Sequence, residues 1–81
     1  MGTYGDAFNT AVAAELRAER GRRKMTVDAI VVVTGLSKSA VLNYLNDKRE
    51  IPTGALADIS AALGVSPRII AERAENAIEE N

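Results

Sequence analysis

The chain contains no cysteine and no histidine, and both absences restrict its chemistry. Without cysteine it can form neither a disulfide nor a thiolate metal site, which fits a reducing compartment. Without histidine it lacks the commonest general base and the commonest metal ligand. It also has no Gly-rich loop of the kind that cradles phosphates. We therefore predict a protein that is not an enzyme and that needs no metal or other cofactor.

Aromatic residues are also scarce, at 4% of 81 residues, whereas hydrophobic residues as a whole make up an ordinary 47%. The core must therefore be built from Ala, Val, Ile and Leu, which suits short, closely packed helices. No apolar run approaches the ~18 residues of a membrane span, and the N-terminus has no signal-peptide pattern. The sequence predicts one cytoplasmic domain over residues 1–81.

The net charge is only −1, but it is distributed unevenly along the chain. Residues 1–49 carry eight basic and five acidic side chains, whereas residues 50–81 carry two basic and six acidic ones. A basic half joined to an acidic half is a polarised molecule, and such polarity is typical of a nucleic-acid-binding face.

The first half of the chain predicts two helices. Phe8, Val12 and Leu16 recur every four positions, which indicates a helix that Asp6 caps and that ends at Gly21. Residues 21–24 then read as a short basic connection. A second helix is expected from the cap Thr26 to Gly35. Residues 27–33 are β-branched enough to keep a strand as the alternative, but a lone strand would have no partner.

Three more helices are expected in the rest of the chain. Ser37 caps a third helix that runs to Asn46, with Val41, Tyr44 and Leu45 as its apolar stripe. After an irregular loop over residues 47–52, Thr53 caps a fourth helix that ends at Gly64. Ser66 and Pro67 open a fifth that continues to about Glu79. The predicted fold is all-α, a compact five-helix bundle.

Two short helices joined by a tight Gly-containing turn are the geometry of the helix-turn-helix unit. The segment TVDAIVVVTGLSKSAV, from Thr26 to Val41, resembles the motif of the Cro and cI phage-repressor family. The continuation NYLNDKR, from Asn43 to Arg49, and the later segment LGVS, from Leu63 to Ser66, are similar to that family too. The likeness covers about Phe8 to Ile70.

The resemblance implies a lambda-repressor-like domain that binds double-stranded DNA and regulates transcription as a Cro-like protein or a repressor. The third helix would read base edges in the major groove. The base-reading positions carried over are Lys38, Ser39 and Asn43, and Leu42 would contact a thymine methyl group. The positions expected to contact DNA phosphates are Arg17, Arg22, Arg23, Lys24, Thr26, Asn46, Lys48 and Arg49.

Three features depart from the family pattern. Val27 stands where relatives commonly have Gln, so a polar contact at the start of the second helix is lost. Leu45 stands where relatives have a Glu that pairs with an Arg of the first helix, so we expect Arg17 to be freed for phosphate. The connection after the first helix is also about three residues longer than is usual in the family.

The last helix offers more apolar length than a small core needs. A homodimer on a pseudo-palindromic operator is therefore a hypothesis, with contacts at Ile70, Ala74, Ala77 and Ile78. Packing within the chain's own core is the simpler alternative for these residues and for Val31, Val32 and Val33. As an alternative function, the fold could serve as a protein-interaction module, for example an antitoxin-like partner, which the low pI of about 5.3 and Val27 favour.

Overall fold

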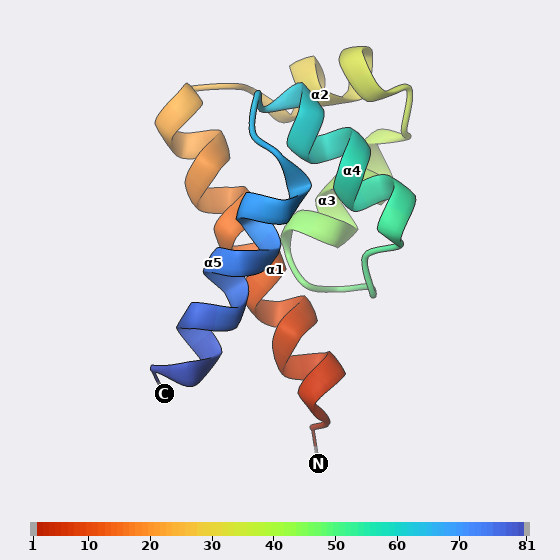
Figure 1. The fold of residues 1–81 in the computed structure, drawn as a ribbon. Helices are drawn as coiled ribbons and strands as arrows, with labels where there is room; N and C mark the ends of the chain where they lie inside the picture. The colour runs from red at the N-terminus through yellow and green to blue at the C-terminus, as the bar shows by residue number, and fades with distance from the viewer. Residues whose placement is uncertain (1, 81) are drawn as a thin grey trace.

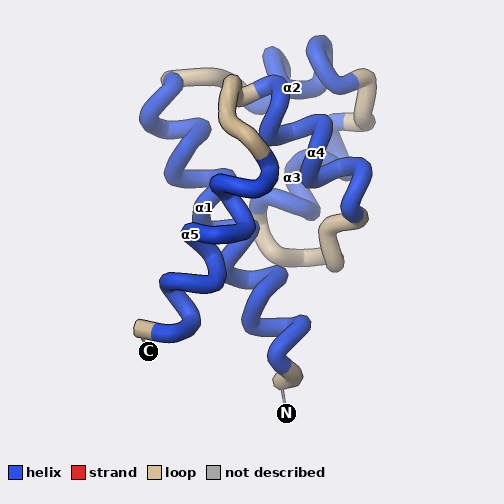
Figure 2. Tube along the Cα trace, in the orientation of Figure 1, coloured by secondary structure: helices blue, strands red, loops and turns tan. Residues whose placement is uncertain are grey.

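The computed structural model describes residues 2–80, and these form five α-helices and no strand (Figures 1 and 2). The helices are α1 (Tyr4–Arg23), α2 (Val27–Thr34), α3 (Lys38–Leu45), α4 (Thr53–Ala62) and α5 (Pro67–Glu79). The all-α prediction is confirmed, and the strand alternative for residues 27–33 is wrong because these residues form α2. Met1 and Asn81, the ends of the predicted domain, lie outside the described residues.

Helix α1 begins earlier and ends later than predicted. Thr3 is its N-cap, and Asp6 lies three residues into the helix, where the two residues form a reciprocal capping box. The helix passes through Gly21 and is closed by Lys24, which adopts the left-handed conformation with φ 54°. Residues 21–23 are therefore the last turn of α1. The predictions of an Asp6 cap, a Gly21 stop and a longer basic connection are wrong.

The helix-turn-helix unit has the predicted local signals. The hydroxyls of Thr26 and Ser37 accept hydrogen bonds from the backbone N–H groups of Ala29 and Ala40, at 3.1 and 3.0 Å. Gly35 takes the left-handed conformation, φ 75°, that ends α2. Helices α2 and α3 meet at 119°, close to the geometry of the DNA-binding helix-turn-helix.

Helices α4 and α5 follow the predicted order with one shifted cap. Pro52 is the N-cap of α4, so Thr53 is its first residue rather than its cap. Ser66 caps α5 and Pro67 occupies the first turn, as predicted. Figure 1 shows α1 and α5 crossing on one side of the molecule, with α2, α3 and α4 on the other.

The core is one cluster of aliphatic side chains contributed by all five helices. Its largest fully buried apolar residues are Leu16, Ile30, Val41, Ile59 and Ile70. Contrary to expectation, Val32 and Val33 are not packed, since they are 82% and 62% exposed. At about 100° per residue, Val32 lies roughly opposite the buried Ile30 and faces outward, whereas Val33 lies about 60° from Ile30, at the edge of the buried face.

The apolar face of α5 is used mainly within the chain. Ile70 and Ala74 are fully buried in the core cluster, and the half-buried Ala77 and Ile78 lie further along the helix. Of the four predicted dimer contacts, Ile70 and Ala74 therefore have no exposed surface to offer a second copy.

Within residues 2–80, no single helix is long and apolar enough to cross a bilayer. The pairs α2–α3 and α4–α5 reach that length and composition when counted together, but they are bent by 119° and 107°.

Candidate nucleic-acid interface

The predicted base-reading residues share one face of α3. Lys38, Ser39, Leu42 and Asn43 follow the i, i+1, i+4, i+5 spacing of a helix face, and Val41 and Leu45 on the opposite face are buried. Leu42 is 37% exposed although it is apolar. Lys38 and Ser39 are also exposed and Asn43 is half-buried, so packing onto the core leaves this face of α3 directed largely away from the bundle.

The polar groups on this face have few partners in the chain. Lys38 Nζ lies 3.1 Å from Asp28 Oδ1 on α2, but the two side chains are 59% and 75% exposed, so the ion pair is weak and readily exchanged. Among residues 2–80, nothing hydrogen-bonds the side chain of Ser39 or Asn43. Their donors and acceptors are therefore available to an external ligand.

The residues that follow α3 carry three of the predicted phosphate contacts. Asn46 is the C-cap of α3, and Lys48 and Arg49 lie in the α3–α4 loop, all with exposed side chains. The backbone N–H of Lys48 donates to the carbonyl of Asn43 at 2.8 Å, which joins this loop to α3. The structure therefore places these cations beside the end of α3.

Arg17 has a different environment from the one predicted. Its guanidinium donates a hydrogen bond to the backbone carbonyl of Leu45, in the last turn of α3. The last carbonyls of a helix have no partner within it, and a cation there also matches the helix dipole. The prediction that Leu45 frees Arg17 is thus wrong, because Arg17 binds the Leu45 backbone instead of a side chain.

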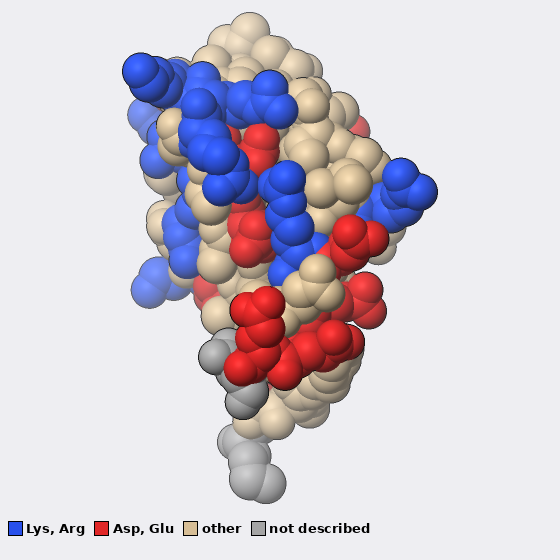
Figure 3. All heavy atoms as spheres, turned by 60° about the vertical axis from the view of Figure 1, so that its left-hand side comes forward, with Lys and Arg blue, Asp and Glu red and all other residues tan. Residues whose placement is uncertain are grey.

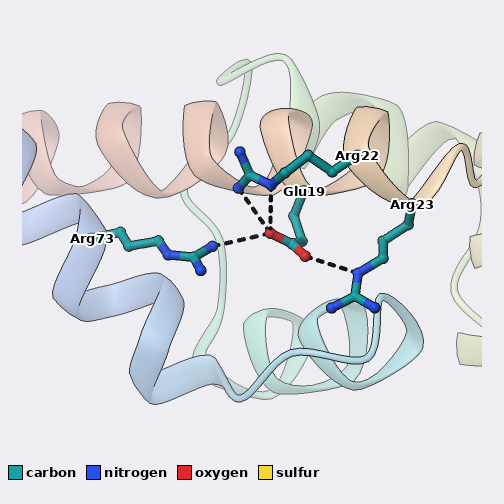
Figure 4. Close-up of polar contacts among 4 residues, drawn as sticks. All are labelled: Glu19, Arg22, Arg23 and Arg73. Atoms are coloured by element: carbon teal, nitrogen blue, oxygen red, sulfur yellow. Dashed lines mark hydrogen bonds and ion pairs between the residues drawn. The ribbon is translucent and has the colours of Figure 1, made fainter.

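Arg22 and Arg23 gather around Glu19, a carboxylate that the sequence analysis did not single out (Figure 4). Arg22 Nη2 lies 2.8 Å from Glu19 Oε1, and Arg23 Nε lies 2.9 Å from Oε2. Arg73 on α5 reaches Oε1 at 3.0 Å, so the cluster joins α1 to α5. Hydrogen bonds from Arg22, then from Arg23, lower the pKa of Glu19 to about 2 despite its burial.

Four of the predicted phosphate contacts fall into two groups. Figure 3 shows Lys and Arg gathered over the upper part of the α1–α5 side, with most of the acidic side chains on that view below them. Arg22 and Arg23 belong to the Glu19 cluster, whereas Lys48 and Arg49 belong to the α3–α4 loop. The two groups lie on different elements, and the second is joined to α3 by the hydrogen bond from the Lys48 N–H to the Asn43 carbonyl.

Sequence reasoning missed several residues that shape the site. Glu19 precedes Arg22 and Arg23 by three and four positions, a helical spacing that would have predicted the cluster had the helix been extended past Gly21. Asn9 and Thr10 hydrogen-bond Asp47, a contact that spans 38 and 37 positions. No local pattern signals that contact.

The Glu19 cluster predicts a specific acid sensitivity. Because the pKa of Glu19 falls from its ordinary 4.5 to about 2 in the folded chain, ionised Glu19 stabilises the fold fully above pH 4.5. That contribution is lost progressively as the pH falls from 4.5 towards 2. Glu19→Gln should therefore be less stable than the wild type near neutral pH, and the difference should shrink across this window. Urea denaturation followed by circular dichroism at a series of pH values measures it; a constant difference down to pH 2 would contradict the assignment.

Comparison with known proteins agrees with the geometry of α2 and α3. A family model described as a helix-turn-helix domain matches residues 11–75, a span that contains α2, α3 and α4 entirely. No curated protein and no solved structure matches the chain. Helix-turn-helix domains generally bind DNA through the second helix of the motif, here α3. Because the match covers most of its length, the chain belongs to the helix-turn-helix domain family.

Proposed function

We propose that this protein is a sequence-specific regulator of transcription, of Cro or repressor type, that inserts α3 into the major groove of double-stranded DNA. The observation that carries the proposal is the exposed polar face of α3, on a helix set at 119° to α2. The major groove is wide enough to admit one helix, and it presents a distinct pattern of donors and acceptors for each base pair.

The side chains on α3 match this chemistry. Lys38 can donate to guanine O6 and N7, the Asn43 amide can bond adenine in a bidentate manner, and Ser39 can serve as donor or acceptor. Leu42 adds an exposed apolar group suited to a thymine methyl. On binding, Lys38 would exchange its exposed partner Asp28 for a base edge.

Residues on both sides of α3 would contact DNA phosphates, and we call this set of residues the phosphate grip. Asn46, Lys48 and Arg49 follow α3, while Thr26 and Lys24 lie at the start of α2 and the end of α1. Arg17, Arg22 and Arg23 carry hydrogen bonds within the chain, so we assign them a smaller share of the contacts. Such contacts fix the register on the duplex and carry no sequence information.

The proposal includes a homodimer on a pseudo-palindromic operator in the cytoplasm. Helix-turn-helix dimers bind half-sites about one helical turn apart, so the symmetry of the protein appears in the DNA. The half-buried Ile78, near the end of α5, is the residue best placed for the dimer contact. Selected sites with two inverted half-sites would support a dimer; single half-sites would indicate a monomer.

The test is a selection from random duplexes followed by sequencing, with affinity then measured against salt concentration. We expect one enriched motif. The logarithm of the association constant should fall linearly with the logarithm of salt concentration, with a slope of about −0.9 for each phosphate neutralised. Affinity that does not depend on salt would contradict the phosphate grip, and salt-dependent binding without a motif would contradict sequence-specific reading.

The exposed Val32 and Val33 on α2 support a second candidate, a module that binds a partner protein. This candidate predicts no salt-sensitive binding to any duplex, including DNA that flanks its own gene. The same selection therefore separates the two functions.

A further inference from the structure

The loop that carries Lys48 and Arg49 is tied to α1 by the side chain of Asp47. Asn9 Nδ2 donates to Asp47 Oδ1 at 2.7 Å, and the hydroxyl of Thr10 donates to Oδ2 at 2.6 Å. Each carboxylate oxygen thus has its own donor on α1. Both bonds lie at the surface, so the link between the loop and α1 depends on several hydrogen bonds acting together and not on burial.

Asn9 also binds the backbone of the loop beyond Asp47. Its Nδ2 donates to the carbonyl of Arg49 at 3.3 Å, and its Oδ1 accepts from the N–H of Ile51 at 2.8 Å. One amide side chain therefore contacts the loop at three positions. Lys48 lies between two of these contacts, and Arg49 provides one through its own carbonyl.

Asp47 combines a left-handed backbone with a side chain that binds α1. Asp47 has φ 56°, in the left-handed region that glycine adopts without penalty and that other residues rarely occupy. A glycine would remove that strain but would leave Asn9 and Thr10 without the carboxylate. Asp47 therefore supplies both a left-handed backbone, which Asp tolerates better than most residues, and the carboxylate that binds α1.

The same face of α1 also fixes the end of the reading helix. Arg17, two turns beyond Asn9 and Thr10, donates to the carbonyl of Leu45 in α3. Helix α1 thus holds both the C-terminal turn of α3 and the loop that follows it. The relative positions of the base-reading face and of Lys48 and Arg49 are set by contacts to one rigid helix.

We infer that Asn9, Thr10 and Asp47, which we call the α1–loop clamp, are positioning residues for DNA binding. They would touch no base. Instead they would hold the backbone at Lys48 and Arg49 where these two side chains can contact phosphates when α3 lies in the major groove. The inference rests on the proposed function. Without the clamp, the loop must be ordered during binding, and its two cations engage phosphates less often.

The test uses the full chain and a duplex from the selection, with affinity measured by fluorescence anisotropy over a range of salt concentrations. Thr10→Val removes the hydroxyl donor at nearly constant shape, and Asn9→Ala removes the amide. We expect affinity to fall about 3- to 10-fold for all duplexes alike, and the salt slope to become shallower by about 1 to 2. Thr10→Ser keeps the donor and should behave as the wild type.

A double-mutant cycle isolates the positioning role. In a background that carries Lys48→Ala and Arg49→Ala, Asn9→Ala should cost no further affinity, because the cations that it positions are already absent. Unfolding by urea shows whether each variant is folded at the temperature of the assay. Folded clamp variants that keep the wild-type salt slope would overturn the clamp while leaving the proposed function standing. A wild-type protein that binds no duplex would overturn both.

Discussion

Replacing Leu16 with alanine is expected to lower the free energy of unfolding by about 2–5 kcal/mol. Leu16 lies on α1, has no exposed surface, and belongs to the cluster that contains Ile30, Val41 and Ile70. Its truncation removes apolar contacts and leaves a cavity between helices that are themselves short. Small domains have about 5–15 kcal/mol of stability in total, so this loss is a large share of it.

Thermal and urea unfolding followed by circular dichroism measure this effect. The matched control is Val32→Ala, also an aliphatic truncation but at a side chain that is 82% exposed. We expect its stability to stay within about 0.5 kcal/mol of the wild type, because it removes no buried contact. Equal losses in the two variants would contradict the assignment of the core.

The second large effect is expected in DNA recognition. Asn43→Ala should cost about 1–3 kcal/mol of binding free energy at a single base pair, because it removes a bidentate hydrogen bond to one adenine. The loss should disappear when that base pair is changed, since the alanine no longer distinguishes it. Repeating the duplex selection with the variant reveals which position of the motif has relaxed.

Lys48→Ala is the matched control for Asn43→Ala, since it removes a cation instead of a base contact. It should weaken binding to all duplexes alike and reduce the salt slope by about 1. The positions of the motif should not change. If Asn43→Ala weakened every sequence uniformly as well, Asn43 would belong to the phosphate grip and not to the reading face.

Local signals in the sequence were sufficient for most of the fold. Thr26, Ser37 and Ser66 each carry a hydroxyl that satisfies a free backbone N–H at the start of a helix, and Gly35 supplies the left-handed residue of the turn. These interactions span two or three residues, or depend on one residue's own conformation. They can therefore be recognised without a tertiary structure.

The sequence was a poorer guide where two local structures were about equally favourable, as at the end of a helix or on the two sides of an apolar one. Gly21 matches a helix end, but α1 continues to Arg23, and in this last turn Arg22 and Arg23 pair with Glu19 from the same helix. Val32 and Val33 look like core residues by hydrophobicity alone. Their exposure follows from the rotation of α2 about its axis, which is decided by what packs against Ile30.

The capped helices, the left-handed turn at Gly35 and the all-α class were thus determined by the sequence itself, through interactions between near neighbours. The tertiary structure alone decided which distant residues hold the helices and the α3–α4 loop together: Arg17 at the end of α3, Arg73 beside Glu19, and Asn9 with Thr10 around Asp47. These contacts join residues 28 to 54 positions apart. Their partners are chosen only when the helices pack, because no periodicity along the chain relates them.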